Sequence, residues 1–280
     1  MVSMVSLDYL LHFIDEDTPY GDLTSEAVIP AVRCRAEISS EESGIIVGLC
    51  EANILFSYYG VIVVQNFQDG DRVKTGDVVF SLAGDAKKIL LVERTVLNII
   101  GRMCGITTQT HDMVNIVSAV NRKCRIAATR KTSPGFRALD KKAVYVGGGD
   151  PHRDSLSDGI LIKDNHLALI SLENAIAAAK KATLYKKIEV EVENTADALV
   201  AASAGADIIL LDNMNPAMVK TTLNALEDKG LRDRVTIELS GGIDPTTLGD
   251  FAALGVDVIS MGALTHTVRN FSVKLEILSG

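Results

Sequence analysis

Positive charge is in deficit in this sequence of 280 residues, since 28 lysines and arginines face 36 aspartates and glutamates, a formal net charge of 28 − 36 = −8. An acidic chain repels a phosphate backbone, so we expect no nucleic-acid partner. Long uninterrupted apolar runs are also missing. The most apolar segment, 44–64, is broken by Glu51 and Asn53, which favours a buried helix and strand over a membrane span.

Cysteine is scarce as well. The four cysteines show no CxxC spacing, and a chain of this length does not need disulfide bonds, so we interpret them as reduced core residues of an intracellular protein. The N-terminus has no basic region and turns acidic from Asp15 onward, which argues against a signal peptide. We therefore expect a cytoplasmic protein.

Several catalytic motifs are absent. The sequence contains no G-x-S-x-G elbow, no Walker loop and no G-x-G-x-x-G fingerprint. None of the five histidines shows a metal-ligand spacing, which argues against a zinc site. The segment DGDRVKTGDVVFSLAG resembles the turn of biotinyl and lipoyl carrier domains, but it lacks their MK-type hairpin, and we interpret it as structural.

The remaining sequence divides into two regions that differ in their pattern of apolar, polar and turn residues. From Val28 to about Asp85, short β-rich runs are separated by GD and TGD turns and by one helical stretch, LCEANILFSYYG, which predicts an α+β domain. From Ile126 onward, continuous apolar runs alternate with helical segments rich in small residues. This rhythm predicts a parallel sheet covered by helices, packed as an α/β barrel. The fold class is therefore α/β.

The apolar runs of the second half end in polar residues or glycine turns. These ends are Arg130 and Lys131, Lys163 and Asp164, Glu191, Asp212 and Asn213, Ser240 to Gly242, and Gly262. The carboxyl ends of barrel strands carry the active site in this architecture. Six such ends in series predict an enzyme site.

A basic cluster dominates these positions. Its members are Arg94, Arg102, Arg130, Lys131, His152, Arg153 and Lys163. Arginine recognises carboxylates with two parallel hydrogen bonds, and lysine adds a point charge, so the cluster indicates a ligand with several negative charges. Solvated surface charge is the alternative, and it remains open above all for Arg102, which is either a ligand-binding or a structural residue.

Carboxylates and glycine turns complete the pattern. Glu191 and Asp212 end successive strands and can share a divalent ion with substrate oxygens, or they can be ion-pair partners of the basic cluster. The turn that begins at Ser240 and the turn at Gly262 let backbone N–H groups approach a phosphate. Gly147 to Gly149 form either a hinge or a loop that admits the ligand near His152.

Taken in order, nine segments closely resemble the quinolinate phosphoribosyltransferases, which are type II phosphoribosyltransferases. The segments are GDLTS, ERTVLNIIGRMCGIT, TRKTSPG, GGGDPHR, LIKDNH, EVEVEN, LLDNM, ELSGGI and VISMGALTH, beginning at residues 21, 93, 129, 147, 161, 189, 210, 238 and 258. The resemblance implies an N-terminal α+β sandwich domain followed by an incomplete parallel barrel of six or seven strands. We assign residues 1–104 and the tail from about 267–280 to the first domain, and residues 105–266 to the barrel.

The resemblance also implies an activity. Quinolinate and phosphoribosyl pyrophosphate (PRPP) would become nicotinate mononucleotide, CO2 and pyrophosphate, with Mg²⁺ as cofactor, on the de novo route to NAD. The assembly would be a homodimer with shared active sites, or a larger oligomer built of dimers. Pro151 departs from the family pattern at GGG-x-NHR, and it leaves as an alternative a related phosphoribosyltransferase of molybdate gene clusters that acts on another cyclic acid or pyrimidine-like ring.

Site residues carry over by position. Quinolinate would be held by Arg130, Lys131, His152, Arg153 and Lys163, together with Arg94 of the neighbouring subunit. Glu191 and Asp212 would contact the ribose and the metal, and with Lys163 they are the expected catalytic residues. The phosphate site would be lined by Ser240, Gly241, Gly242, Gly262 and His266.

Overall fold

The computed structural model describes residues 5–278, which separate into two compact units. Within these residues, the first unit holds the chain up to His111, the segment Thr132–Gly148, and the chain from Leu264 onward. The second unit holds Asp112–Lys131 and Gly149–Ala263. The boundary predicted at 104/105 falls inside one helix of 35 residues, α4 (Ala86–Val120). The sequence-based domain limits stay a prediction.

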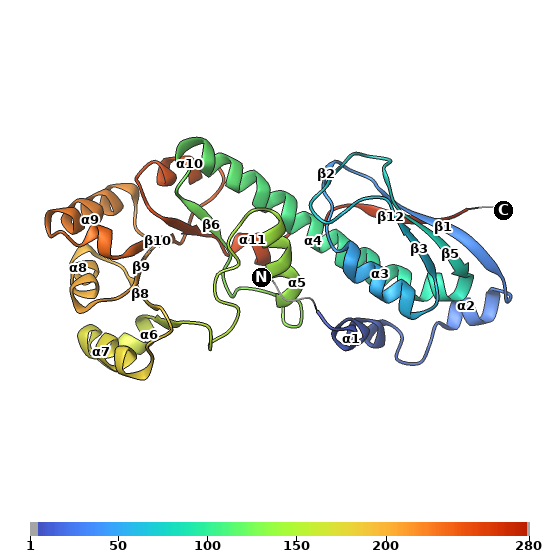
Figure 1. Ribbon diagram of the computed structural model, residues 1–280, viewed down its shortest axis with the longest axis horizontal. Coiled ribbons are helices and arrows are strands. Elements are labelled where there is room, and N and C mark those ends of the chain that lie inside the picture. The colour runs from blue at the N-terminus through green and yellow to red at the C-terminus, as the bar shows by residue number, and fades with distance from the viewer. Residues whose placement is uncertain (1–4, 279–280) are drawn as a thin grey trace. The chain divides into compact units, whose positions relative to one another are not determined.

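The first unit is built on an antiparallel sheet of four strands in the order β12-β1-β5-β3. The last strand pairs with the first along six positions, from Arg35↔Leu278 to Ser40↔Val273. Cross-strand neighbours Ile38 and Phe80 are fully buried, and α3 lies against the sheet (Figure 1). The elements are α1 (Leu7–Asp17), α2 (Leu23–Val28), β1 (Arg33–Ser40), β2 (Gly44–Ile45), α3 (Leu49–Tyr58), β3 (Ile62–Gln65), β4 (Arg72–Val73), β5 (Val78–Asp85), most of α4, α5 (Arg137–Val146), most of α11 (Ala263–His266) and β12 (Val273–Leu278).

The second unit is a parallel sheet of six strands in the order β6-β11-β10-β9-β8-β7. This confirms the predicted incomplete barrel, with six strands in the described residues and β6 and β7 at its two edges. The elements are β6 (Arg125–Ala127), β7 (Ile160–Ile162), α6 (Asp164–Leu167), α7 (Leu172–Ala182), β8 (Ile188–Val192), α8 (Thr195–Ala204), β9 (Ile208–Asp212), α9 (Pro216–Asp228), a 3₁₀ turn (Arg232–Arg234), β10 (Thr236–Ser240), α10 (Leu248–Ala252) and β11 (Val258–Ser260).

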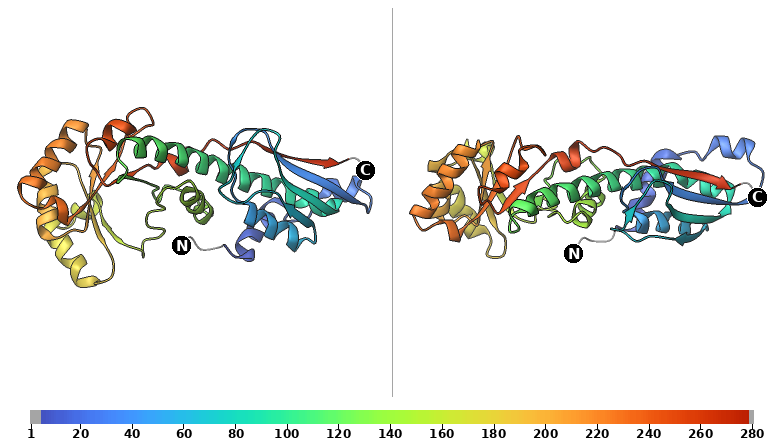
Figure 2. Two further views of the ribbon diagram at one scale, coloured as in Figure 1. Left: turned by 45° about the horizontal axis from the view of Figure 1, so that its top comes forward. Right: turned by 90° about the horizontal axis from the view of Figure 1, so that it is seen from above.

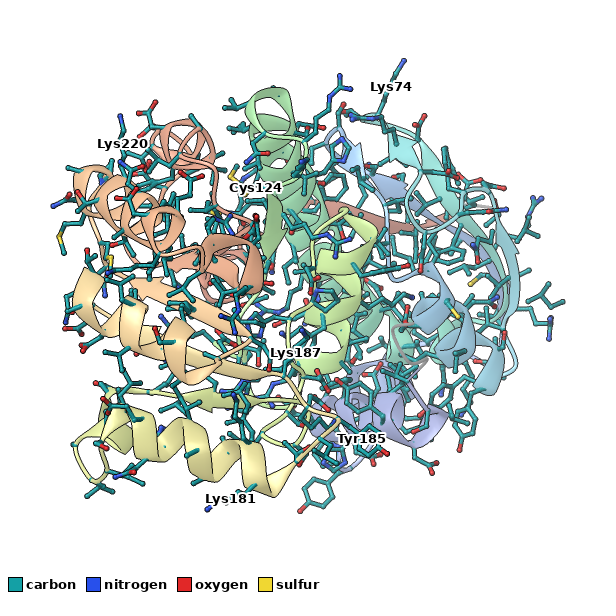
Figure 3. All side chains as sticks on the ribbon, turned by 60° about the vertical axis from the view of Figure 1, so that its left-hand side comes forward. Lys74, Cys124, Lys181, Tyr185, Lys187 and Lys220 are labelled. Carbon is teal, nitrogen blue, oxygen red and sulfur yellow. The ribbon has the colours of Figure 1, made fainter. Side chains whose placement is uncertain are left out.

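Helices cover the outer face of this sheet. In both views of Figure 2, α7 to α9, drawn yellow to orange, lie on the outer side of the strands. Ser171, Asn194 and Asn215 begin these helices, because each side chain accepts a hydrogen bond from a backbone N–H three residues later. Lys181 and Lys220 extend from the helices into solvent (Figure 3). The helices therefore bury apolar residues on one face only.

The segment after α5 runs along the free edge of β6. Asp150 N–H donates to the Ile126 carbonyl at 2.7 Å, and Ala128 N–H donates to the Asp150 carbonyl at 2.9 Å. The backbone of residues 149–151 therefore forms hydrogen bonds with the backbone groups of β6 that the six-stranded sheet leaves unpaired at that edge. It also brings His152 and Arg153 to the interior of the second unit.

No described helix is both long enough and apolar enough to cross a membrane.

Candidate active site

A cavity of about 550 Å³ lies inside the second unit, at the carboxyl ends of its strands. Polar side chains dominate its wall, although Leu161 and Leu210 also contribute. The lining residues are Thr129, Arg130, Lys131, His152, Arg153, Leu161, Lys163, Glu189, Glu191, Leu210, Asp212, Asn213, Glu238, Ser240, Gly241, Gly242 and Ser260. All of them belong to the second unit.

The twofold period of the strands explains why these side chains converge. In β8, Glu189 and Glu191 line the cavity, while Val190 and Val192 are buried on the face that the helices cover. The same alternation brings Asp212 inward from β9 and Ser240 inward from β10. Neighbouring parallel strands thus present their last polar residues to one space.

One side of the cavity carries guanidinium groups. Burial and the nearby Arg130 lower the pKa of Arg153, while Glu189 and Asp158 oppose this change. The Arg153 guanidinium also donates to the Gly159 carbonyl at 3.3 Å, just before β7. Two guanidinium groups close enough to repel each other favour an anion between them.

Another side pairs a cation with a carboxylate. The Lys163 ammonium donates to Glu191, and the backbone N–H of Lys163 donates to Nδ1 of His166 at 3.0 Å. Lys163 remains 43% exposed, whereas Glu191 is 13% exposed. The ion-pair alternative for Glu191 is therefore present in the structure, and the pair still faces the cavity where a ligand can exchange with it.

The turn after β10 requires glycine. Gly241 adopts φ +95°, and a Cβ atom there would collide with the Asn213 side chain. The backbone N–H of Asn213 donates to the Ser240 carbonyl at 2.9 Å, which joins the ends of β9 and β10. Asn213 itself has φ +51°, an uncommon conformation for a residue other than glycine. The two strand ends are thus locked in one arrangement.

The structure brings together ten of the thirteen residues predicted to bind substrate. Those that line the cavity are Arg130, Lys131, His152, Arg153, Lys163, Glu191, Asp212, Ser240, Gly241 and Gly242. Arg94, Gly262 and His266 are not part of its wall. Arg94 is exposed on α4, and Nδ1 of His266 lies 2.7 Å from the hydroxyl oxygen of Thr267. The roles of all thirteen stay predictions.

Arg102 has a structural role in the first unit. Its guanidinium makes two hydrogen bonds of 2.8 Å to the buried Asp140 carboxylate and a third, of 2.9 Å, to the Thr265 carbonyl. This bidentate pair uses the geometry that arginine offers a carboxylate. The structural alternative that the sequence left open therefore holds for Arg102.

Sequence reasoning missed the floor of the cavity. Glu189 and Glu238 are 4% and 3% exposed, and His152 lies beside both, with Nε2 3.6 Å from one carboxylate and 3.4 Å from the other. A signal was available, because a glutamate in the middle of a continuous apolar strand breaks the expected pattern of a buried parallel sheet. His152 also stands at φ +58°, so both described residues other than glycine with positive φ line this cavity.

An open α/β barrel with a cavity at its strand ends, lined by arginine and lysine side chains, defines the class of this protein. Two family models match the chain: the N-terminal domain of quinolinate phosphoribosyl transferase over residues 22–104, and its C-terminal domain over residues 106–276. The chain belongs to the quinolinate phosphoribosyl transferase family.

Relatives of known name agree with the family models. The chain is 44% identical over 274 residues to a probable nicotinate-nucleotide pyrophosphorylase (carboxylating) of Methanothermobacter thermautotrophicus, covering 97% of this chain and 98% of the relative. It is 34% identical to the nicotinate-nucleotide pyrophosphorylase (carboxylating) of Dictyostelium discoideum, with 95% and 93% covered. The solved structure of the nicotinate-nucleotide pyrophosphorylase from Francisella tularensis superposes with a TM-score of 0.91 at 32% identity, with 99% of each chain covered.

Proposed function

We propose that this protein is a decarboxylating quinolinate phosphoribosyltransferase of de novo NAD biosynthesis. It joins quinolinate to PRPP and releases nicotinate mononucleotide, CO2 and pyrophosphate. The observation that carries the proposal is the division of the cavity, with guanidinium groups on one side and carboxylates beside a glycine turn on the other. The proposed location is the cytoplasm.

The guanidinium side suits a dicarboxylate. Arg130, Lys131 and Arg153 would hold the two carboxylates of quinolinate, with Lys163 approaching from β7. The ring nitrogen of a pyridine is already a neutral nucleophile, so the attack on the ribose needs no general base. This agrees with the described cavity wall, which contains no serine or cysteine paired with a histidine as an activated nucleophile.

The other side suits PRPP. Glu191 and Asp212 would contact the ribose hydroxyls, and the Ser240–Gly242 turn would offer N–H groups to the phosphate. Cleavage of the ribose C1–oxygen bond develops positive charge on the sugar, which nearby carboxylates stabilise. The work of the site is to hold two anionic substrates in attack geometry.

The donor set of this wall fits Mg²⁺. Glu191, Asp212 and Asn213 offer carboxylate and amide oxygens, which are the ligands that a hard cation prefers. When bound, Mg²⁺ would take up charge on the departing pyrophosphate. Glu191 and Asp212 are the residues that would hold it.

The test is a substrate comparison. Purified protein with PRPP and Mg²⁺ should consume quinolinate and release CO2 and nicotinate mononucleotide, whereas nicotinate should be a poor substrate. Equal use of nicotinate without CO2 release would contradict the proposal. Consumption of another ring acid in preference to quinolinate would favour the molybdate-cluster alternative that Pro151 left open.

The assembly is proposed to be a homodimer in which Arg94 serves the partner's cavity. Arg94 is exposed on α4 and does not line the cavity of its own second unit. Arg94→Ala and Lys163→Ala proteins should each be nearly inactive. In a twofold symmetric dimer, random mixing gives about half hybrids with one intact site each, so roughly a quarter of parental activity should return. If mixing restores nothing, Arg94 does not act across the dimer.

A further inference from the structure

An asparagine with two uncommon features directly follows β9. Asn213 adopts a left-handed backbone conformation, with φ +51°, and it lines the cavity next to Asp212. Its side-chain amide donates from Nδ2 to Oδ2 of Asp212 at 2.7 Å. An ionised carboxylate only accepts hydrogen bonds, so the amide nitrogen of Asn213 faces Asp212 and the amide oxygen points away from it.

The turn after β10 holds the other side of this amide. A Cβ atom at Gly241 would lie 2.6 Å from Cγ of Asn213 and closer still to its Oδ1, so the amide packs directly against the glycine. The backbone N–H of Asn213 also donates to the Ser240 carbonyl at 2.9 Å. The Asn213 side chain therefore contacts Asp212 on one side and the backbone of Gly241 on the other, and it has little freedom to turn.

This arrangement leaves one oxygen of Asp212 for a ligand. Oδ2 accepts from Asn213, whereas Oδ1 accepts no hydrogen bond from residues 5–278. Asp212 is half-buried and belongs to the cavity wall. Because Oδ2 is already held, the carboxylate loses little rotational freedom when a ligand donates a hydrogen bond to Oδ1.

Asparagine is the residue type that meets both requirements at position 213. Apart from glycine, asparagine and aspartate adopt the left-handed conformation most readily. Glycine would keep the backbone but lose the amide, and aspartate would put a second carboxylate beside Asp212 in place of the N–H donor. Uncommon backbone conformations of this kind occur preferentially at functional sites. The position thus combines a requirement of the turn with a requirement for a donor.

We propose that Asn213 is a positioning residue for PRPP, which acts by holding Oδ1 of Asp212 toward a ribose hydroxyl. The inference rests on the proposed function, in which Asp212 contacts the ribose. A hydrogen bond from a hydroxyl to a charged acceptor is roughly twice as strong as one to a neutral acceptor. A sugar without that hydroxyl would leave Oδ1 unpaired, so the fixed carboxylate also selects for the ribose.

Two variants remove the donor and keep the left-handed backbone. Asn213→Gly deletes the amide, and Asn213→Asp keeps the shape but adds a like charge beside Asp212. Calorimetric titration with PRPP and Mg²⁺, without quinolinate, should show a Kd for PRPP about tenfold higher in Asn213→Gly and higher still in Asn213→Asp. The Kd for quinolinate alone should stay close to that of wild type. Urea unfolding of Asn213→Gly should change little, because glycine adopts φ +51° without strain.

A double-mutant cycle tests whether Asn213 acts through Asp212. In an Asp212→Ala background, Asn213→Gly should cause little further loss of PRPP affinity, because the oxygen that it positions is gone. Asn194 provides the matched control, since its Nδ2 donates to Oδ2 of Asp197 at 2.7 Å, but it caps α8 and is not part of the cavity wall. Asn194→Gly should keep the PRPP affinity of wild type.

Each outcome decides the inference. Unchanged PRPP affinity in Asn213→Gly would overturn it. Equal weakening of PRPP and quinolinate would also overturn it, since a general disturbance of the strand ends affects both substrates. Additive losses in the cycle would show that Asn213 acts independently of Asp212. If Asn213→Asp fails to fold, Asn213→Gly still decides. Wild-type protein that binds no PRPP would instead overturn the proposed function, and the inference with it.

Discussion

Both units bury charged groups, but they satisfy them differently. In the first unit, Lys142 lies 2.8 Å from Glu51 and 2.7 Å from Asp69, and Arg102 grips Asp140 with two hydrogen bonds. In the second unit, four buried atoms of the cavity wall have no hydrogen-bond partner: Arg130 Nε, Glu189 Oε1, Glu238 Oε1 and Ser260 Oγ. The first unit completes its buried charges within the chain. The cavity wall keeps polar atoms that can form hydrogen bonds with a ligand. Leaving them unpaired lowers the stability of the folded chain, a cost that is typical of functional sites.

Breaking a completed pair should have the largest effect on stability. Asp140→Ala removes the partner of Arg102 and should lower the free energy of unfolding by about 3–5 kcal/mol, because a partly buried guanidinium loses its counter-charge. Urea unfolding followed by circular dichroism measures the change. Asp140→Asn, which keeps one acceptor, should lose less. A loss below about 1 kcal/mol would show that the pair is dispensable and would remove the contrast between the units.

Removing a cavity cation should instead affect activity. Lys163→Ala should lower kcat/KM by about 100-fold or more, roughly 2.7 kcal/mol, whereas stability should change by less than about 1 kcal/mol because the lysine is 43% exposed. Lys87→Ala, which breaks an ion pair with Glu26 in the first unit, is the control that should keep full activity. A Lys163 variant within a few-fold of wild type would remove this residue from the site.

The strand-end residues could be predicted because two regular patterns determine them. Apolar runs that end in polar residues give the strand ends, and parallel strands place those ends along one edge. This reasoning found Lys163, Glu191 and Asp212, which the structure brings to one cavity. It also gave the six strands, since their continuous apolar runs are bounded by polar residues.

The cavity floor could not be predicted in the same way. Glu189 and Glu238 meet His152 only because β8, β10 and the segment after α5 converge, and the sequence separations of these elements do not reveal that meeting. The role of Arg102 depended likewise on Asp140, which is 38 positions away along the chain. Long-range pairings of single side chains need tertiary structure, whereas periodicity is local.

Loss of the Glu191 or Asp212 carboxylate should affect the binding of PRPP more than the binding of quinolinate. Glu191→Ala and Asp212→Ala should raise the KM for PRPP and the Mg²⁺ requirement by about tenfold or more, since each removes a charged hydrogen-bond partner worth about 1.5–3 kcal/mol, while the binding of quinolinate alone should change much less. Calorimetric titrations with each substrate measure the difference. Unchanged PRPP affinity in both variants would reduce the pair to ion-pair partners of the basic residues.

The smallest expected changes in stability allow the most direct comparison of a paired with an unpaired buried polar group. Helix α4 contains two buried threonines that differ only in this respect. Thr107 and Thr110 are both fully buried, but the Thr107 hydroxyl donates to the Ala143 carbonyl at 2.9 Å, whereas the Thr110 hydroxyl has no hydrogen-bond partner. Valine has nearly the same shape as threonine. Thr107→Val should therefore cost about 1 kcal/mol, and Thr110→Val should be neutral or stabilise by up to about 1 kcal/mol.

Ser260 allows the same comparison in the cavity wall, because its buried hydroxyl also has no hydrogen-bond partner. Ser260→Ala should match Thr110→Val in unfolding free energy, since both remove a hydroxyl that makes no hydrogen bond in the folded chain. The two should differ in kinetics: Thr110→Val should keep the KM values of wild type, and Ser260→Ala should raise one of them by a few-fold. Urea midpoints and steady-state kinetics on the three variants measure both properties. If Ser260→Ala destabilises the protein as much as Thr107→Val and leaves every KM unchanged, the Ser260 hydroxyl stabilises the fold. Unpaired polar atoms in the cavity wall would then no longer indicate where a ligand binds.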